Sequence, residues 1–200
     1  MRKIAPYALL GIALFVGAWL SFEFFGPKTP LPRYANASIG GDFKLNSVDG
    51  EQSLSDFRGE VVLVYFGFMS CPDVCPTSMA VMKQAINQLN EAERAKVRGI
   101  FISVDPERDT VDELNAYTQY FSDRIFGMTG SKEQIDAVVK QYGAYYKFVQ
   151  LDDSALGYTV DHSARIYLID PEGQLADILA HDINPAELHA KIAAYFKSAL

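Results

Sequence analysis

An almost uninterrupted apolar run, Val61 to Phe68, constrains the fold of this chain more than any other segment. Its length and its β-branched and aromatic residues are typical of a strand buried on both faces of a sheet. A helical pattern follows over about Pro76 to Val97, where apolar residues recur at spacings of three and four. The two segments together predict a buried strand that leads into a helix.

The rest of the sequence alternates between strand and helix patterns, which indicates an α/β layer fold with a mixed sheet. A short hairpin is expected over 43–54, around Asp49-Gly50. Residues 151–163 show no clear periodicity and are expected to form a loop. Further strands are expected at 98–104, 125–128, 164–170 and 175–180, and further helices at 111–121, 131–143 and 185–196.

The N-terminus carries a long apolar segment. Two basic residues, Arg2 and Lys3, precede a run from Ile4 to about Phe25. Roughly twenty residues at about 1.5 Å each span the core of a bilayer, so residues 1–25 are predicted to be a membrane anchor. A cleaved signal peptide is the alternative, although its apolar core is normally only about 7–15 residues long.

The positions of the basic residues predict the orientation of the anchor. Arg2 and Lys3 should stay cytoplasmic, which places the C-terminal domain on the far side of the membrane. A long Arg- and Ser-rich transit peptide is absent, which favours a single-pass protein of the bacterial inner membrane with its domain in the periplasm. Residues 26–40 are rich in Pro and Gly and are interpreted as a linker, leaving 41–200 as the domain.

Size and charge limit the range of functions. The roughly 170 residues beyond about residue 30 are enough for one domain that buries about 70% of its unfolded surface, so it needs no disulfide to fold. Its two cysteines are therefore available for function. The net charge is −7 and no basic stripe is present, so nucleic acid is not expected as a partner.

The only two cysteines, Cys71 and Cys75, lie where the predicted strand becomes the predicted helix. Unpaired N–H groups and the helix dipole favour negative charge at this position, so a thiolate forms easily. Residues four apart on a helix share one face, and their separation is close to the range of a disulfide. The pattern indicates redox chemistry, metal binding or both. Two buried structural cysteines are the alternative.

A third metal ligand has to come from the three histidines. His162 lies in a loop that runs directly into a predicted strand and can return to the edge where the cysteines lie. His181 is expected just past a strand end and His189 on a helix surface, neither as a ligand. A solvated or hydrogen-bonding loop histidine is the alternative for His162. Structural zinc normally takes four ligands, while thiolates select Cu(I) and imidazole also suits copper. Copper is the metal that this set of residues fits best.

Carboxylates near these residues are candidates for supporting roles. Asp161 is placed to orient the His162 ring, and Asp105 and Asp109 follow a predicted strand on the edge where α/β proteins usually have their sites. The simpler interpretations are a solvated carboxylate at Asp161 and a salt-bridged turn around Arg108. Asp73 is interpreted as a helix cap or a contact for a partner.

Three motifs together resemble the Sco family (SenC/PrrC-type proteins) over nearly all of residues 40–198. The motifs are Phe66-Gly67-Phe68 with Cys71-Pro72-Asp73-Val74-Cys75-Pro76-Thr77, Ser103-Val104-Asp105-Pro106-Glu107-Arg108-Asp109-Thr110, and Val160-Asp161-His162-Ser163. The resemblance implies a thioredoxin-like fold behind one transmembrane helix. It also implies that Cys71, Cys75 and His162 bind copper, as Cu(I) or Cu(II). The implied role is assembly of the binuclear copper centre of cytochrome c oxidase subunit II.

Two functional interpretations stay open beside delivery of copper. A dedicated thiol–disulfide oxidoreductase would reduce the cysteines of the recipient copper site, although thioredoxins use Cys-x-x-Cys and this chain has one residue more. A peroxidatic enzyme would need an arginine beside an activated cysteine, and no such motif accompanies Cys71 or Cys75. A metal carrier rather than an enzyme is expected, with subunit II and other periplasmic copper chaperones as its partners.

Overall fold

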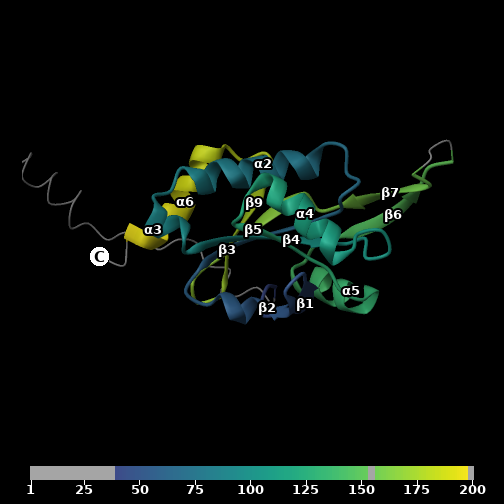
Figure 1. Cartoon of the computed structure of the whole chain (residues 1–200), viewed down its shortest axis with the longest axis horizontal. Helices are drawn as coiled ribbons and strands as arrows, with labels where there is room; N and C mark the ends of the chain where they lie inside the picture. Colours follow the sequence, from purple (N-terminus) through teal and green to yellow (C-terminus); the bar gives the residue numbers. More distant parts are fainter. Residues whose placement is uncertain (1–38, 153–155, 198–200) are drawn as a thin grey trace, which may run out of the picture. The chain divides into compact units, whose positions relative to one another are not determined.

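The apolar run forms strand β3 (Val61–Gly67), and all of its residues are buried as the sequence predicts. The computed structural model describes residues 39–152 and 156–197. In it, β3 lies at the centre of a five-stranded sheet with the order β5-β4-β3-β8-β9. The strand is buried because helices and loops cover both faces of this sheet (Figure 1).

The sheet is mixed, as expected from the order of the elements. β4 (Val97–Ser103) and β5 (Ile125–Met128) extend it in parallel on one side of β3. On the other side, β8 (Arg165–Ile169) pairs antiparallel with β3 and forms a hairpin with β9 (Leu175–Ala180). The carboxyl ends of β3 and β4 therefore lie side by side, and the loops that carry polar residues leave from that edge.

Side chains alternate between the two faces of β3, and the two faces meet different layers. Tyr65 stacks on Phe101 on the face covered by helices α2 and α4, whereas Phe66 contacts Tyr142 and Tyr167 on the opposite face. The first layer contains α2 (Val74–Asn87), α4 (Val111–Phe121) and α6 (Pro185–Lys197) (Figure 1). The second layer contains β1 (Lys44–Ser47), β2 (Gly50–Ser53), the 3₁₀ helix η1 (Leu54–Phe57) and α5 (Lys132–Gln141).

The helix predicted over 76–97 differs from the structure at both ends. Helix α2 begins at Val74 and ends at Asn87, so Cys75 already belongs to its first turn. The chain then turns, and Asn90 caps a second short helix, α3 (Glu91–Arg94), by accepting a hydrogen bond from the backbone N–H of Glu93. The apolar periodicity continues across this turn, which is why the sequence predicts one long helix.

The loop predicted over 151–163 is wrong for five of its residues, 158–162. Tyr158–His162 forms strand β7, which pairs antiparallel with β6 (Tyr146–Gln150) in a two-stranded sheet of its own. Only Val160 of β7 is buried, so the strand lacks the apolar pattern that reveals the central strands. The β6–β7 hairpin extends away from the central sheet (Figure 1).

The predicted anchor (1–25) and most of the linker (26–40) lie outside the described residues. Among residues 39–152 and 156–197, no helix has both the length and the apolar character needed to cross a membrane. The structure therefore describes the domain that follows the predicted linker.

Candidate metal centre

The two cysteines lie at the junction of strand and helix, as the sequence predicts, but only Cys75 is helical. Cys71 occupies the turn between β3 and α2, where its N–H donates to the carbonyl oxygen of Phe68 at 3.3 Å. The N–H of Cys75 points at the sulfur of Cys71, with 3.5 Å between N and Sγ. Cys75 is buried and Cys71 is half-buried, so the site reaches solvent on the Cys71 side.

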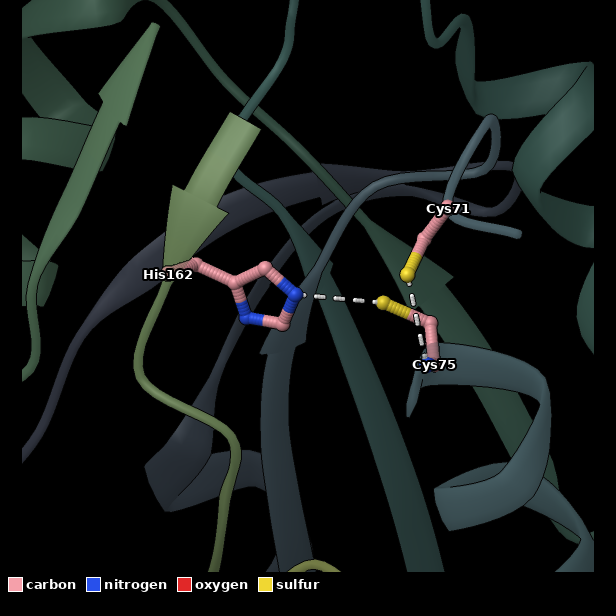
Figure 2. Close-up of side chains that lie close together, drawn as sticks. All are labelled: Cys71, Cys75 and His162. Carbon is pink, nitrogen blue, oxygen red and sulfur yellow. Dashed lines mark hydrogen bonds between the residues drawn. The ribbon is translucent and has the colours of Figure 1, made fainter. Parts of the chain in front are cut away.

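His162 approaches the cysteines from the end of β7. Its Nε2 lies 3.4 Å from the sulfur of Cys75 (Figure 2). The imidazole ring is held edge-on by the aromatic rings of Tyr65 and Phe68. The two sulfurs and one ring nitrogen all lie within 4.8 Å of one another. Residues that are 87 positions apart in the sequence thus form one cluster of donor atoms.

The pKa values of the two cysteines are shifted in opposite directions. The Cys75 thiol donates to Cys71, and this bond together with one from His162 lowers the pKa of Cys71 to about 4. The same interaction and burial raise the pKa of Cys75, which stays protonated. Because the thiolate is the form that binds metals and attacks disulfides, Cys71 is ready for either reaction at neutral pH.

The cluster fits a soft metal ion of low coordination number. Bonds of about 2.0–2.3 Å, such as zinc makes to nitrogen and sulfur, would place three donors roughly 3.8–4.0 Å apart around one ion. The observed donors need only small adjustments to reach that spacing. The other ring nitrogen of His162, Nδ1, is buried without a partner, so no competing bond turns the ring away. Among the described residues, no further His, Cys, Asp or Glu joins this cluster.

The other predicted site residues are outside the cluster. Asp161 is exposed and makes no hydrogen bond to the His162 ring in the described part of the chain, so the structure does not support an orienting role. Asp73 is the N-cap of α2, but its side chain makes no capping bond. His181 follows β9 and His189 lies on α6, and neither joins the three donors.

The loop after β4 has contacts that the sequence does not reveal. The expected ion pair between Asp105 and Arg108 is present at 2.5 Å. In addition, Asp109 accepts a hydrogen bond from the backbone of Met69, two residues before Cys71. The two residues are 40 positions apart, so no local pattern in the sequence predicts this bond.

A mixed sheet with two thiols at the junction of strand and helix and one imidazole beside them defines a thioredoxin-like domain with a candidate metal site. The SCO1/SenC family model matches residues 32–197, so the chain belongs to this family. It is 42% identical over 183 residues to the mitochondrial SCO2 homolog of Bos taurus, covering 88% of this chain and 68% of that protein.

Solved structures of the family share this fold. The copper-bound crystal structure of Arabidopsis thaliana ScoI is 35% identical, with a TM-score of 0.73 over 80% of this chain and 99% of that one. BsSco, described as a member of the Sco family of cytochrome c oxidase assembly proteins, is 25% identical. Its TM-score is 0.62 over 85% of this chain and 97% of its own, and a disulfide switch has been identified in it. The expected thioredoxin-like fold is confirmed.

Proposed function

We propose that this chain is a copper-binding assembly factor and that Cys71, Cys75 and His162 are its copper ligands. The observation that carries the proposal is the convergence of these three donor atoms within 4.8 Å. Two thiolates and an imidazole are a donor set that suits Cu(I), and the imidazole also suits Cu(II). The copper bound in the Arabidopsis relative supports the same assignment.

Burial of the ligands suggests how the cargo enters and leaves. Because metal binding requires deprotonated thiols, loading would release the proton of Cys75. Cys71 is half-buried and already a thiolate, so an incoming thiolate of a partner would reach the ion from the Cys71 side. A three-coordinate ion leaves room for that extra ligand, which permits transfer by ligand exchange.

The recipient that we propose is the binuclear copper centre of cytochrome c oxidase subunit II. The description of BsSco as a cytochrome c oxidase assembly protein supports this choice. The apolar segment 1–25 would anchor the domain in the bacterial inner membrane and hold it in the periplasm, beside a membrane-bound recipient. Other periplasmic copper chaperones would supply the ion.

Reduction of the recipient's cysteines is the second candidate function, and the low pKa of Cys71 favours it. In this reaction the Cys71 thiolate attacks the recipient's disulfide and forms a mixed disulfide. The recipient thiolate released in this step takes the proton of the Cys75 thiol, and the resulting Cys75 thiolate attacks the sulfur of Cys71. This attack releases the second recipient sulfur as a thiolate, which takes a proton from water, and leaves a Cys71–Cys75 disulfide. A periplasmic dithiol reductant would restore the two thiols. The disulfide switch in BsSco supports a redox-active pair.

A copper competition experiment separates the two functions. The reduced full chain is loaded with Cu(I) and titrated with a competing chelator, beside His162→Ala and the matched control His189→Ala. We expect about one copper per chain, lost from His162→Ala at chelator concentrations that the parent and the control tolerate. Equal loss of copper from all three would contradict the three-ligand site and favour the reductase.

The anchor is tested independently of copper. Two proteins are produced in bacteria. One is the full chain, and the other begins at residue 26 and carries a periplasmic export signal in place of the apolar segment. The full chain is expected in the membrane fraction and the shorter form in the soluble periplasmic fraction. Recovery of the full chain in the soluble fraction would contradict the anchor.

A further inference from the structure

We propose that the loop Asp105–Thr110 positions both halves of the site. Asp105 and Arg108 hold Tyr158, and through strand β7 they position His162. Asp109 holds the backbone just before Cys71. The inference rests on the proposed copper site and adds the residues that set its geometry. The loop leaves the carboxyl end of β4, next to the end of β3. It therefore lies between the segment that carries the cysteines and the strand that carries the histidine.

Asp109 fixes the cysteine side. Its carboxylate is 1% exposed, and its Oδ2 accepts hydrogen bonds from the backbone N–H of Met69 at 2.9 Å and from the hydroxyl of Ser103 at 2.6 Å. Burying a carboxylate is costly unless such bonds compensate it, so these contacts fix its position. The Met69 bond ties the backbone two residues before Cys71 to Asp109, and the Ser103 bond ties Asp109 to the end of β4.

Asp105 and Arg108 fix the histidine side through one tyrosine. Asp105 is fully buried, and its two oxygens accept bonds from the hydroxyl of Tyr158 at 2.8 Å and from Nε of Arg108 at 2.5 Å. Arg108 also donates from Nη1 to the carbonyl oxygen of Tyr158 at 3.0 Å. Its guanidinium lies 3.7 Å from the centre of the Tyr158 ring. Ring, hydroxyl and backbone of Tyr158 are thus all held.

The hairpin needs this attachment because it lies outside the central sheet. β7 pairs only with β6 among the described strands, so no ladder of backbone bonds fixes it relative to β3. Tyr158 begins β7 and His162 ends it, so the two are four steps of about 3.4 Å apart along one extended strand. A shift at Tyr158 would therefore move the His162 ring away from the sulfur of Cys75.

Tests of the histidine side use variants that keep size or charge. Tyr158→Phe removes the hydroxyl that bonds Asp105, and Arg108→Lys loses the planar fork that binds both Asp105 and Tyr158. Cu(I) affinity should fall about two- to tenfold for Tyr158→Phe and roughly tenfold or more for Arg108→Lys. The controls Tyr120→Phe, at an exposed ring, and Arg94→Lys, which pairs with Asp123, should change nothing.

A second background distinguishes positioning of His162 from a general loss of structure. When His162→Ala is already present, Tyr158→Phe and Arg108→Lys should lower the Cu(I) affinity no further, because the group that they position is gone. Equal losses in both backgrounds, or no loss in the parent, would overturn the histidine side of the proposal.

A measurement without metal keeps the result independent of the proposed function. In the reduced apoprotein, the NMR signals of the His162 ring should shift in Tyr158→Phe and stay unchanged in Tyr120→Phe. Unchanged signals in Tyr158→Phe would overturn the inference even if copper binds. Shifted signals together with a parent that binds no copper would support the positioning role and contradict only the copper site.

The cysteine side has its own expectation. Asp109→Ala should lower the Cu(I) affinity in the parent and in His162→Ala alike, because it acts through the backbone before Cys71. Asp109→Asn keeps an oxygen that accepts both bonds and should restore most of the affinity, and it serves as the test if Asp109→Ala does not fold. An Asp109→Asn protein that folds but no longer binds Cu(I) would overturn the proposed role of Asp109.

Discussion

A Cβ atom on Gly67 would lie 2.8 Å from the sulfur of Cys75, so the end of β3 accommodates that sulfur because it carries no side chain. The same atom would also lie 2.8 Å from the ring of Phe101. Both neighbours are fully buried and have little freedom to move. The Cys75 sulfur and the glycine therefore occupy one tightly packed position.

Gly67→Ala is expected to destabilise the fold and to disturb the site. Overpacking in a core typically costs about 1–3 kcal/mol, measurable as a lower free energy of unfolding in urea. The Cu(I) affinity should fall as well, because the sulfur of Cys75 has to shift. Gly99→Ala is the matched control: its Cβ would meet Met82 and Ile125 at 2.9 Å, away from the donors. A similar loss of stability with intact copper binding is expected there, and equal copper loss in both variants would count against the role of Gly67.

The low pKa of Cys71 predicts an unusual pH profile of alkylation. With a pKa of about 4, Cys71 stays a thiolate from neutral pH down to about pH 5 and is protonated as the pH falls through 4. The rate at which Cys71 reacts with iodoacetamide should be nearly constant from neutral pH down to about pH 5 and should fall below that. Mass spectrometry of the reduced apoprotein follows this reaction. Cys75 should react slowly throughout, since its pKa is raised and its sulfur is buried.

Removal of the Cys75 thiol supplies the control for this profile. Cys75→Ala deletes the main hydrogen bond to the Cys71 sulfur, so the pKa of Cys71 should rise toward the ordinary value of about 8.5. A parent profile with its midpoint near the ordinary cysteine pKa, or a midpoint that does not move in Cys75→Ala, would contradict the claim that a hydrogen bond from Cys75 lowers the pKa of Cys71.

Ser131→Ala should affect stability without affecting the site. The Ser131 side chain caps α5 by accepting a hydrogen bond from the N–H of Gln134 at 3.3 Å. Loss of such a cap costs about 1 kcal/mol, which urea unfolding resolves. Helix α5 packs on the face of the sheet opposite to the cysteines, so the Cu(I) affinity should stay at the parent value. A change in affinity would show that the two layers are coupled.

Local patterns in the sequence predict the elements whose burial is regular. The continuous apolar run gives β3, and the Asp49-Gly50 pair gives the β1–β2 hairpin. The position of both cysteines at the end of β3 follows from the same reasoning. Each of these features depends on residues that are close together in the chain.

Features that depend on distant contacts are not predicted. Strand β7 is half exposed and is stabilised by pairing with β6, so its own residues do not reveal it. The start of α2 at Val74 places only Cys75 in the helix, a detail that apolar spacing does not define. The bond from Met69 to Asp109 and the position of Tyr158 between Asp105 and Arg108 join segments whose proximity exists only in the fold.

X-ray absorption of the reduced, Cu(I)-loaded full chain tests the central claim most directly, because it counts the atoms bound to copper. The account predicts two sulfur ligands and one nitrogen ligand, with the outer-shell signal of an imidazole that disappears in His162→Ala and persists in His189→Ala. A spectrum with two sulfurs and no imidazole signal, or an imidazole signal that survives in His162→Ala, would contradict the site formed by Cys71, Cys75 and His162.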